Sequence, residues 1–149
     1  MNRELYLLSN SRMPGGEPFA WALDELLRAW DGRIKSAALV PFAGVTLSWD
    51  EYLEYVSSVF GPCGITVSSV HRSADANQLV KDADAVFVGG GNSFHRSYHL
   101  HASGLMPVIR DLCLNGKPYM GWSAGANVAC PTMRTTNDNS VSFSTATAV

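Results

Sequence analysis

The chain has 149 residues, 46% of them apolar, and a formal net charge of −2. This length and apolar share suit one domain with an ordinary core. The sequence has no block of lysine or arginine, so binding to nucleic acid or to an anionic membrane through bulk charge is not expected. It also has no apolar run of about 18 residues, the length that a membrane-spanning helix needs.

The cysteines and the N-terminus indicate a compartment. Cys63, Cys113 and Cys130 are odd in number and lack the spacing of a metal site, which favours free thiols in a reducing environment. The apolar stretch that follows Met1 is too short for a signal peptide. We therefore expect a cytoplasmic protein.

Short apolar runs alternate with helical spacing along the whole chain. Each run has the length and composition of a buried strand, and each helical stretch repeats its apolar residues every three or four positions. The predicted strands are residues 5–8, 37–40, 65–70, 85–88 and 118–120. The predicted helices are residues 19–30, 48–60, 76–81 and 94–114, the last as one or two helices.

Helix boundaries are marked by specific residue types. Ser48 and Glu51 have the spacing of a capping box, which predicts a helix start. Asp31-Gly32 is expected to end the preceding helix, and Gly61-Pro62 the one that Ser48 begins.

Five alternations of strand and helix with short links predict a parallel sheet with helices on both faces. In such sheets ligands bind beyond the carboxyl ends of the strands. Polar or glycine-rich loops follow all five predicted strands, and we expect them to share one rim. They are residues 9–11, 41–46, 71–75, 89–93 and 121–125.

The stretch Gly121-Trp122-Ser123-Ala124-Gly125 has the pattern Gly-x-Ser-x-Gly directly after a predicted strand. In a nucleophile elbow, such a serine occupies a strained strand-to-helix turn, and the next backbone N–H faces an oxyanion. The alternative is a turn of small residues whose serine only caps a helix. The pattern makes Ser123 the candidate nucleophile.

Gly89-Gly90-Gly91 ends another predicted strand, where backbone N–H groups approach a ligand closely. We interpret this loop as a cradle for an oxyanion or a carboxylate. A phosphate loop or a plain tight turn is the alternative. The run matches neither a dinucleotide-binding fingerprint nor a P-loop, because no lysine follows.

A serine nucleophile needs an acid and a base. Asp138 lies in a polar stretch after Ser123, in the order nucleophile then acid that α/β hydrolases use. As an isolated residue, an aspartate in such a stretch is far more typical of a solvated turn.

The histidines fit that order poorly, because all four precede Ser123. His95 and His99 have the i, i+4 spacing of metal ligands but no evident third ligand, so a solvated helix face explains them and His101 better. His71 follows a predicted strand and stands next to Arg72. We expect His71 at the rim as a substrate-lining or structural residue rather than the base.

Residues 140–149 are small and uncharged, unlike the preceding chain. They fit an edge strand or a disordered tail.

Several motifs together resemble the peptidase E family of serine peptidases, the α-aspartyl dipeptidases. The resemblance covers about residues 4–139. It is carried by the order and spacing of short stretches at 7–11, 41–46, 49–52, 71–72, 89–94, 121–127, 130–132 and 134–138.

This resemblance implies a flavodoxin-like sheet related to class I glutamine amidotransferases. It also implies hydrolysis of dipeptides with an N-terminal aspartate, without metal or cofactor. Ser123 matches the family nucleophile and Asp138 the acidic member of its triad. Gly90 and Gly91, with the N–H of Ala124, match the oxyanion hole. Asn92, beside those glycines, is placed at the rim with His71.

The chain also departs from the family. Members continue for roughly another third of their length beyond the position of Asp138, and the triad histidine lies there. We therefore predict an incomplete peptidase E-like domain over residues 1–139, a divergent tail over 140–149, and little or no hydrolysis by this chain. The alternative function is a catalytically inactive binding or regulatory module. An unfinished sheet also predicts aggregation or a strand-paired homodimer.

Overall fold

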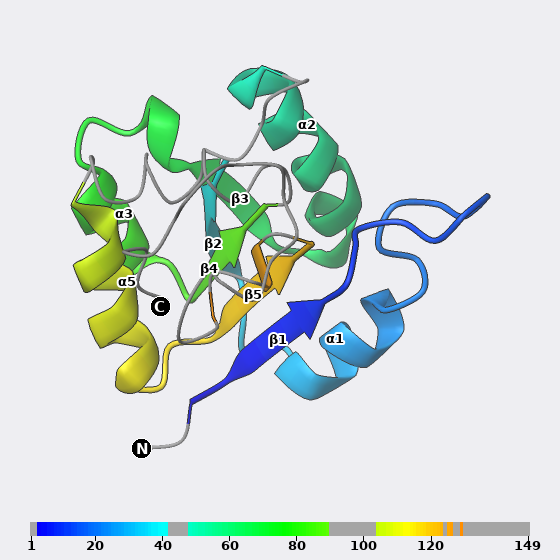
Figure 1. Ribbon diagram of the computed structural model, residues 1–149, viewed down its shortest axis with the longest axis horizontal. Helices are drawn as coiled ribbons and strands as arrows, with labels where there is room; N and C mark the ends of the chain where they lie inside the picture. Colours follow the sequence, from blue (N-terminus) through cyan, green and yellow to red (C-terminus); the bar gives the residue numbers. More distant parts are fainter. Residues whose placement is uncertain (1–2, 42–47, 90–103, 124, 127–128, 130–149) are drawn as a thin grey trace, which may run out of the picture.

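The computed structural model describes residues 3–41, 48–89, 104–123, 125–126 and 129. Within them the chain forms a single five-stranded sheet in which all pairs of neighbouring strands are parallel (Figure 1). The strands are β1 (Leu5–Leu8), β2 (Ser36–Val40), β3 (Thr66–Ser69), β4 (Ala85–Val88) and β5 (Tyr119–Trp122). The predicted parallel α/β fold is confirmed.

The strand order across the sheet is β1-β5-β4-β2-β3. From β3 to β5 it repeats the order 2-1-3-4 that begins a flavodoxin-like sheet. The place of the fifth flavodoxin strand is taken by β1, which comes first in the sequence. The N-terminal strand therefore lies beside β5, the strand that leads to Ser123.

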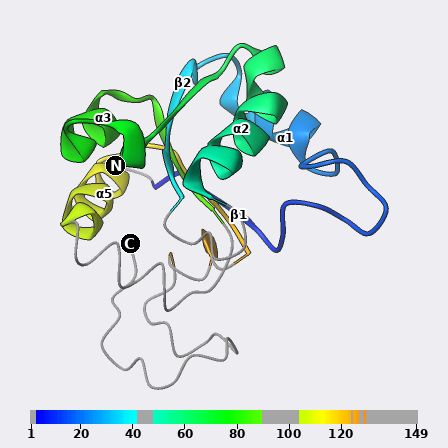
Figure 2. The same cartoon turned by 90° about the horizontal axis from the view of Figure 1, so that it is seen from above.

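Helices cover both faces of the sheet (Figure 2). α1 (Leu23–Trp30) and α2 (Trp49–Phe60) lie on one face, and α3 (Ala76–Asp82) and α5 (Leu105–Leu114) on the other. Two short 3-10 helices, η1 (Gly61–Cys63) and η2 (Val70–Arg72), flank β3.

The predicted helix signals hold at two boundaries. Ser48 Oγ accepts a hydrogen bond from the N–H of Glu51, whose carboxylate accepts one from the N–H of Ser48, so the capping box begins α2 as expected. α1 ends at Asp31, which adopts the left-handed conformation at φ 47° before Gly32. Two predicted elements are shorter here: β3 stops at Ser69 because Val70 begins η2, and α1 begins at Leu23 rather than at Phe19. Of the helices predicted over residues 94–114, α5 lies within the described residues, and 94–103 lie outside them.

Aromatic side chains fill the layer between the sheet and α1 with α2. The indole of Trp30 stacks on Phe87 with ring centroids 5.8 Å apart, and Phe19 meets Trp122 edge-on at 4.9 Å. Trp122, which directly precedes the candidate nucleophile, is only 1% exposed. This aromatic packing holds the carboxyl end of β5 in place.

Lys117 joins α3 to the start of β5. Its ammonium group donates hydrogen bonds to the carbonyl oxygens of Val80, Lys81 and Ala83 at the end of α3. A cation placed on the last carbonyls of a helix compensates the negative end of its dipole.

None of the helices in the described part of the chain has both the length and the apolar character needed to cross a bilayer.

Candidate active site

Ser123 occupies a strained turn at the carboxyl end of β5. It is a non-glycine residue with φ 55°, a left-handed conformation that side chains disfavour. Its N–H donates to the carbonyl oxygen of Leu8 on β1 at 2.9 Å, and its own carbonyl accepts from the N–H of Ala126 at 3.0 Å. The strained turn that the Gly-x-Ser-x-Gly pattern predicts is therefore present.

The two glycines of the pattern are required by close backbone contacts. A Cβ atom on Gly121 would collide with the carbonyl group of Gly125. A Cβ on Gly125 would collide with the carbonyl oxygen of Val88 at the end of β4. The turn folds back on its own strand and onto the neighbouring strand, so only glycine fits at either position.

The serine itself remains accessible. Ser123 is exposed, whereas Trp122 before it and Gly125 after it are buried. A serine that caps a helix or fills a core needs neither the strain nor this exposure. The geometry favours a side chain presented to a ligand, and the catalytic role of Ser123 stays a prediction.

Two tyrosine hydroxyls form hydrogen bonds with residues next to Ser123. Tyr119, on β5, donates a hydrogen bond to the carbonyl oxygen of Gly125 at 2.8 Å. Tyr52, on α2, accepts one from the indole N–H of Trp122 at 3.0 Å, and its ring packs where a Cβ on Gly89 would lie. Sequence analysis assigned neither hydroxyl a role. A hydroxyl within an otherwise apolar strand, as at Tyr119, is the signal that could have found one of them.

Asn10 follows β1 at the same rim. Its side-chain oxygen is buried and has no hydrogen-bond partner among the described residues. Buried acceptors are nearly always paired, so an unpaired one marks strain or function. The sequence placed the loop 9–11 at the rim but gave no signal for this atom.

The other predicted site residues lie outside the described part of the chain. They are Gly90, Gly91, Asn92, Ala124 and Asp138. The same is true of His95, His99, His101 and Cys130. Their expected roles stay predictions. No group of three His, Cys, Asp or Glu side chains suited to hold a metal occurs among the described residues.

His71 lies at the carboxyl end of β3 within a hydrogen-bonded cluster. Its Nε2 is 2.7 Å from Asp50 Oδ1, and its Nδ1 is 2.5 Å from Ser69 Oγ. A carboxylate only accepts, so Nε2 carries a proton, and in the neutral ring Nδ1 accepts from the Ser69 hydroxyl. The imidazole side chain is 9% exposed. Both ring nitrogens are therefore already engaged.

Arg72 completes this cluster. Its Nε donates to Asp50 Oδ1 at 2.8 Å, the same oxygen that contacts His71. The guanidinium of Arg72, followed by the imidazole of His71, lowers the pKa of Asp50 to about 2. The cluster ties the first turn of α2 to η2. Sequence analysis did not predict it.

The structure does not bring His71 and Ser123 together. β4 and β2 lie between β5 and β3, which makes three strand spacings. At about 4.8 Å each, these separate the two strand ends by roughly 14 Å. Proton transfer needs a contact of about 3 Å. His71 lies on the rim, as expected, but in a position suited to structure rather than to general-base catalysis at Ser123.

A family model described as peptidase family S51 matches residues 5–147. The chain belongs to this family. Peptidase E of Salmonella typhi is 47% identical over 135 residues, which are 91% of this chain and 58% of that protein. Peptidase E of Shigella flexneri is 45% identical over the same shares. The S51 chain thus spans less than three fifths of the length of these curated relatives.

Solved structures share the fold. A candidate peptidase E protein from Listeria monocytogenes EGD-e superposes with a TM-score of 0.72 and 21% identity, covering 98% of this chain and 73% of that one. A peptidase from an acI-B1 Actinobacterium gives 0.62 and 19%, covering 89% and 59%. The S51 fold of the chain is therefore that of these proteins, as the resemblance predicted.

Proposed function

We propose that this S51 chain carries the nucleophile half of a serine peptidase that hydrolyses dipeptides with an N-terminal aspartate. One observation carries the proposal. Ser123 is exposed in a strained turn whose flanking positions admit only glycine. Similarity to peptidase E over most of the chain supports the peptide substrate. The preference for aspartate rests on the family resemblance alone.

In the proposed reaction, Ser123 Oγ attacks the carbonyl carbon of the scissile peptide bond. A general base takes the hydroxyl proton, and backbone N–H groups of Ala124 and of the Gly90-Gly91 loop stabilise the oxyanion. Collapse of the tetrahedral intermediate transfers that proton to the leaving amine and leaves an acyl-enzyme. Water then attacks the ester, releases aspartate and returns the proton to Ser123. Asp138 orients the base.

No histidine in the described part of the chain is placed to act as this base. His71 is the histidine in the described part of the chain, and its ring is bound to Asp50 and Ser69 three strands away. A serine peptidase that lacks its base retains only binding and oxyanion stabilisation, which lowers its rate by several orders of magnitude. We therefore expect weak or undetectable hydrolysis by this chain alone.

The test measures release of leucine from Asp-Leu, with Salmonella typhi peptidase E as the positive control. We expect any release to disappear in Ser123→Ala and to persist in Ser58→Ala, which removes an exposed serine from α2. Release should also be much faster from Asp-Leu than from Ala-Leu. Turnover that survives in Ser123→Ala would contradict the assignment of the nucleophile.

The engaged state of His71 favours a second candidate, a binding module without catalysis. This candidate predicts that Asp-Leu binds without being cleaved, which calorimetric titration of the chain measures. Binding without release selects the second candidate over the first. If the chain neither binds nor cleaves Asp-Leu, both candidate functions are contradicted.

A further inference from the structure

The proposed oxyanion hole draws on two segments that follow neighbouring strands. The serine turn (residues 123–126) follows β5, and the glycine loop (residues 89–91) follows β4. A Cβ atom on Gly125 would lie 3.1 Å from the carbonyl oxygen of Gly89, so the two segments pack backbone against backbone. Because an oxyanion hole needs N–H groups at fixed positions, the spacing of these segments decides whether the hole can form.

Tyr52, on α2, contacts the chain at the start of both segments. Its hydroxyl accepts a hydrogen bond from the indole N–H of Trp122 at 3.0 Å, directly before the serine turn. The two rings are nearly parallel, at 14°, with centroids 6.3 Å apart. The ring and hydroxyl of Tyr52 also occupy the space that a Cβ on Gly89 would need, at the start of the glycine loop. One residue, only 8% exposed, therefore lies against both segments.

The glycine at position 89 is explained by this tyrosine. Gly89 is not among the glycines with positive φ, so its backbone conformation does not require glycine. The tyrosine does require it, because a larger residue would collide with the Tyr52 ring. That ring cannot move aside without breaking its hydrogen bond to Trp122. Tyr52 and Gly89 therefore fit together as a pair.

The backbone of Tyr52 is anchored in the first turn of α2. Its N–H donates to the carbonyl oxygen of Ser48 at 3.0 Å, within the capping box. Two residues earlier, the carboxylate of Asp50 is bonded to the side chains of His71 and Arg72 on η2. Tyr52 is therefore held in place at its backbone as well as at its hydroxyl.

We propose that Tyr52 is a positioning residue that sets the spacing between the serine turn and the glycine loop, and through it the geometry of the oxyanion hole. The inference rests on the part of the proposed function that takes Ser123 as nucleophile and the glycine loop as a source of oxyanion donors. Packing alone requires neither the hydroxyl of Tyr52 nor its close approach to Gly89. Both contacts lie one residue from the groups that they would position, since Trp122 precedes Ser123 and Gly89 precedes Gly90.

The test replaces Ser123 by cysteine, because a thiolate reacts without a general base. The thiolate displaces iodide from iodoacetamide, and mass spectrometry of the peptides distinguishes this thiol from Cys63, Cys113 and Cys130. N–H groups of the serine turn and the glycine loop stabilise the thiolate, which lowers the pH at which alkylation becomes fast. We expect Tyr52→Phe in the Ser123→Cys background to move that pH upward. Alkylation at pH 7 should slow by about threefold to tenfold.

A second variant tests whether the hydrogen bond carries this effect. Trp122→Phe removes the other partner of the bond, so it should slow alkylation about as much as Tyr52→Phe does. The two substitutions together should slow alkylation no further, because they break the same interaction. Slowing that adds up in the double variant would overturn the proposal. A cooperative unfolding transition for each variant shows that it is folded.

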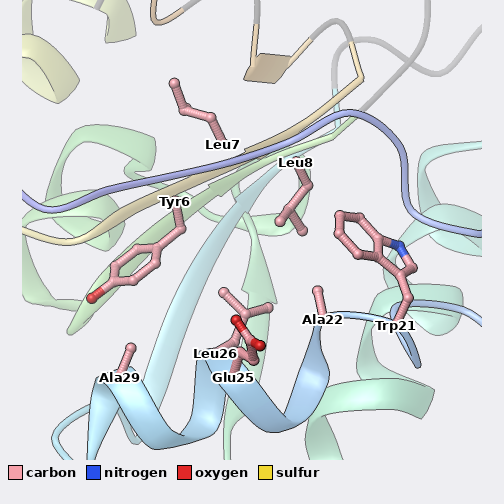
Figure 3. A pocket seen from close by; sticks show the side chains of 8 residues that line it. All are labelled: Tyr6, Leu7, Leu8, Trp21, Ala22, Glu25, Leu26 and Ala29. Atoms are coloured by element: carbon pink, nitrogen blue, oxygen red, sulfur yellow. The ribbon is translucent and has the colours of Figure 1, made fainter.

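Tyr6→Phe is the matched control, because it also removes one tyrosine hydroxyl. Tyr6 points from β1 toward α1 in a groove of about 460 Å³ (Figure 3). Its hydroxyl bonds Glu4 at 3.1 Å, at the amino end of the strand. The control should leave alkylation unchanged.

The outcomes separate this proposal from the proposed function. Unchanged alkylation in folded Tyr52→Phe would overturn the positioning role and leave Ser123 as the nucleophile. A thiol in the Ser123→Cys variant that titrates like free cysteine would overturn both. If Asp-Leu is neither bound nor cleaved while Tyr52→Phe slows alkylation, the proposed function fails and the positioning role of Tyr52 stands.

Discussion

The carboxyl ends of β5 and β3 carry similar residue types, but their side chains differ in exposure and in hydrogen bonding. At β5, Ser123 is exposed and strained, and its supports are backbone atoms and tyrosine hydroxyls beneath it. At β3, His71 is almost covered and hydrogen-bonded at both ring nitrogens. The first end exposes a strained side chain to solvent. The side chains at the second end hold α2 and η2 together. The presence of Ser, His and Asp side chains therefore does not by itself indicate a catalytic site. It must also be known which of their polar atoms are not already engaged in hydrogen bonds.

The largest expected effect tests whether the β5 end depends on close backbone approach. Gly125→Ala should lower the free energy of unfolding by about 3 kcal/mol, because its Cβ would collide with the Val88 carbonyl. Urea unfolding followed by circular dichroism measures the change. Ser58→Ala is the control: Ser58 is exposed inside α2, where alanine favours the helix, so this variant should be neutral or slightly stabilising. Equal stability of the two variants would contradict the close contact.

The next effect tests the structural role of the β3 end. His71→Ala should cost about 2 kcal/mol of unfolding free energy, because the hydroxyl of Ser69, a residue 3% exposed, loses its partner. Urea unfolding again gives the value. The Ser123-dependent release of leucine, per folded molecule, should not change. A loss of release beyond the unfolded fraction would show that His71 acts on the reaction.

A smaller effect measures the strain at Ser123. Ser123→Gly should be more stable than Ser123→Ala by about 0.5 to 1 kcal/mol, because glycine adopts φ 55° without a Cβ penalty. The same pair at Ser58, inside α2, should show the opposite sign, since glycine weakens a helix relative to alanine. Matching signs at the two sites would argue against strain.

The smallest effect concerns the charge of Asp50. Its pKa falls from the usual 3.8 to about 2 in the folded chain, chiefly through Arg72 and then His71. A lowered carboxyl pKa adds stability above the unfolded value, and that stability is lost as pH falls through the folded value. The difference in urea midpoint between the native chain and Asp50→Ala should therefore hold down to about pH 4 and vanish toward pH 2. A difference that persists at pH 2 would contradict this origin.

Local signals were enough to predict most of the elements and the strained turn at Ser123. The Ser48–Glu51 box set the start of α2 because both hydrogen bonds close within four residues. The Gly-x-Ser-x-Gly pattern predicted a strained turn because steric limits on φ act within single residues. These parts of the fold depend on neighbours in the sequence.

Contacts between distant residues were not predictable in the same way. Asp50 and His71 meet only because α2 returns the chain to β3. No signal in the sequence around either residue predicts this contact. The hydroxyl of Tyr52 reaches Trp122 across 70 positions of sequence. The pairing of β1 with β5 likewise joins residues more than 100 positions apart, such as Leu5 and Tyr119.

The hydrogen bond from the N–H of Ser123 to Leu8 has a consequence for the order of folding. It joins the first strand of the sheet to the last, so the chain between them must be synthesised before the bond can form. Closing so long a loop is slow compared with forming local contacts such as α2. β2, β3 and β4 can pair with one another during synthesis, before β5 is available to β1. Until β5 is made, β1 is unpaired and its leucines are accessible to chaperones. We therefore expect the serine turn to form late in folding, when β1 pairs with β5.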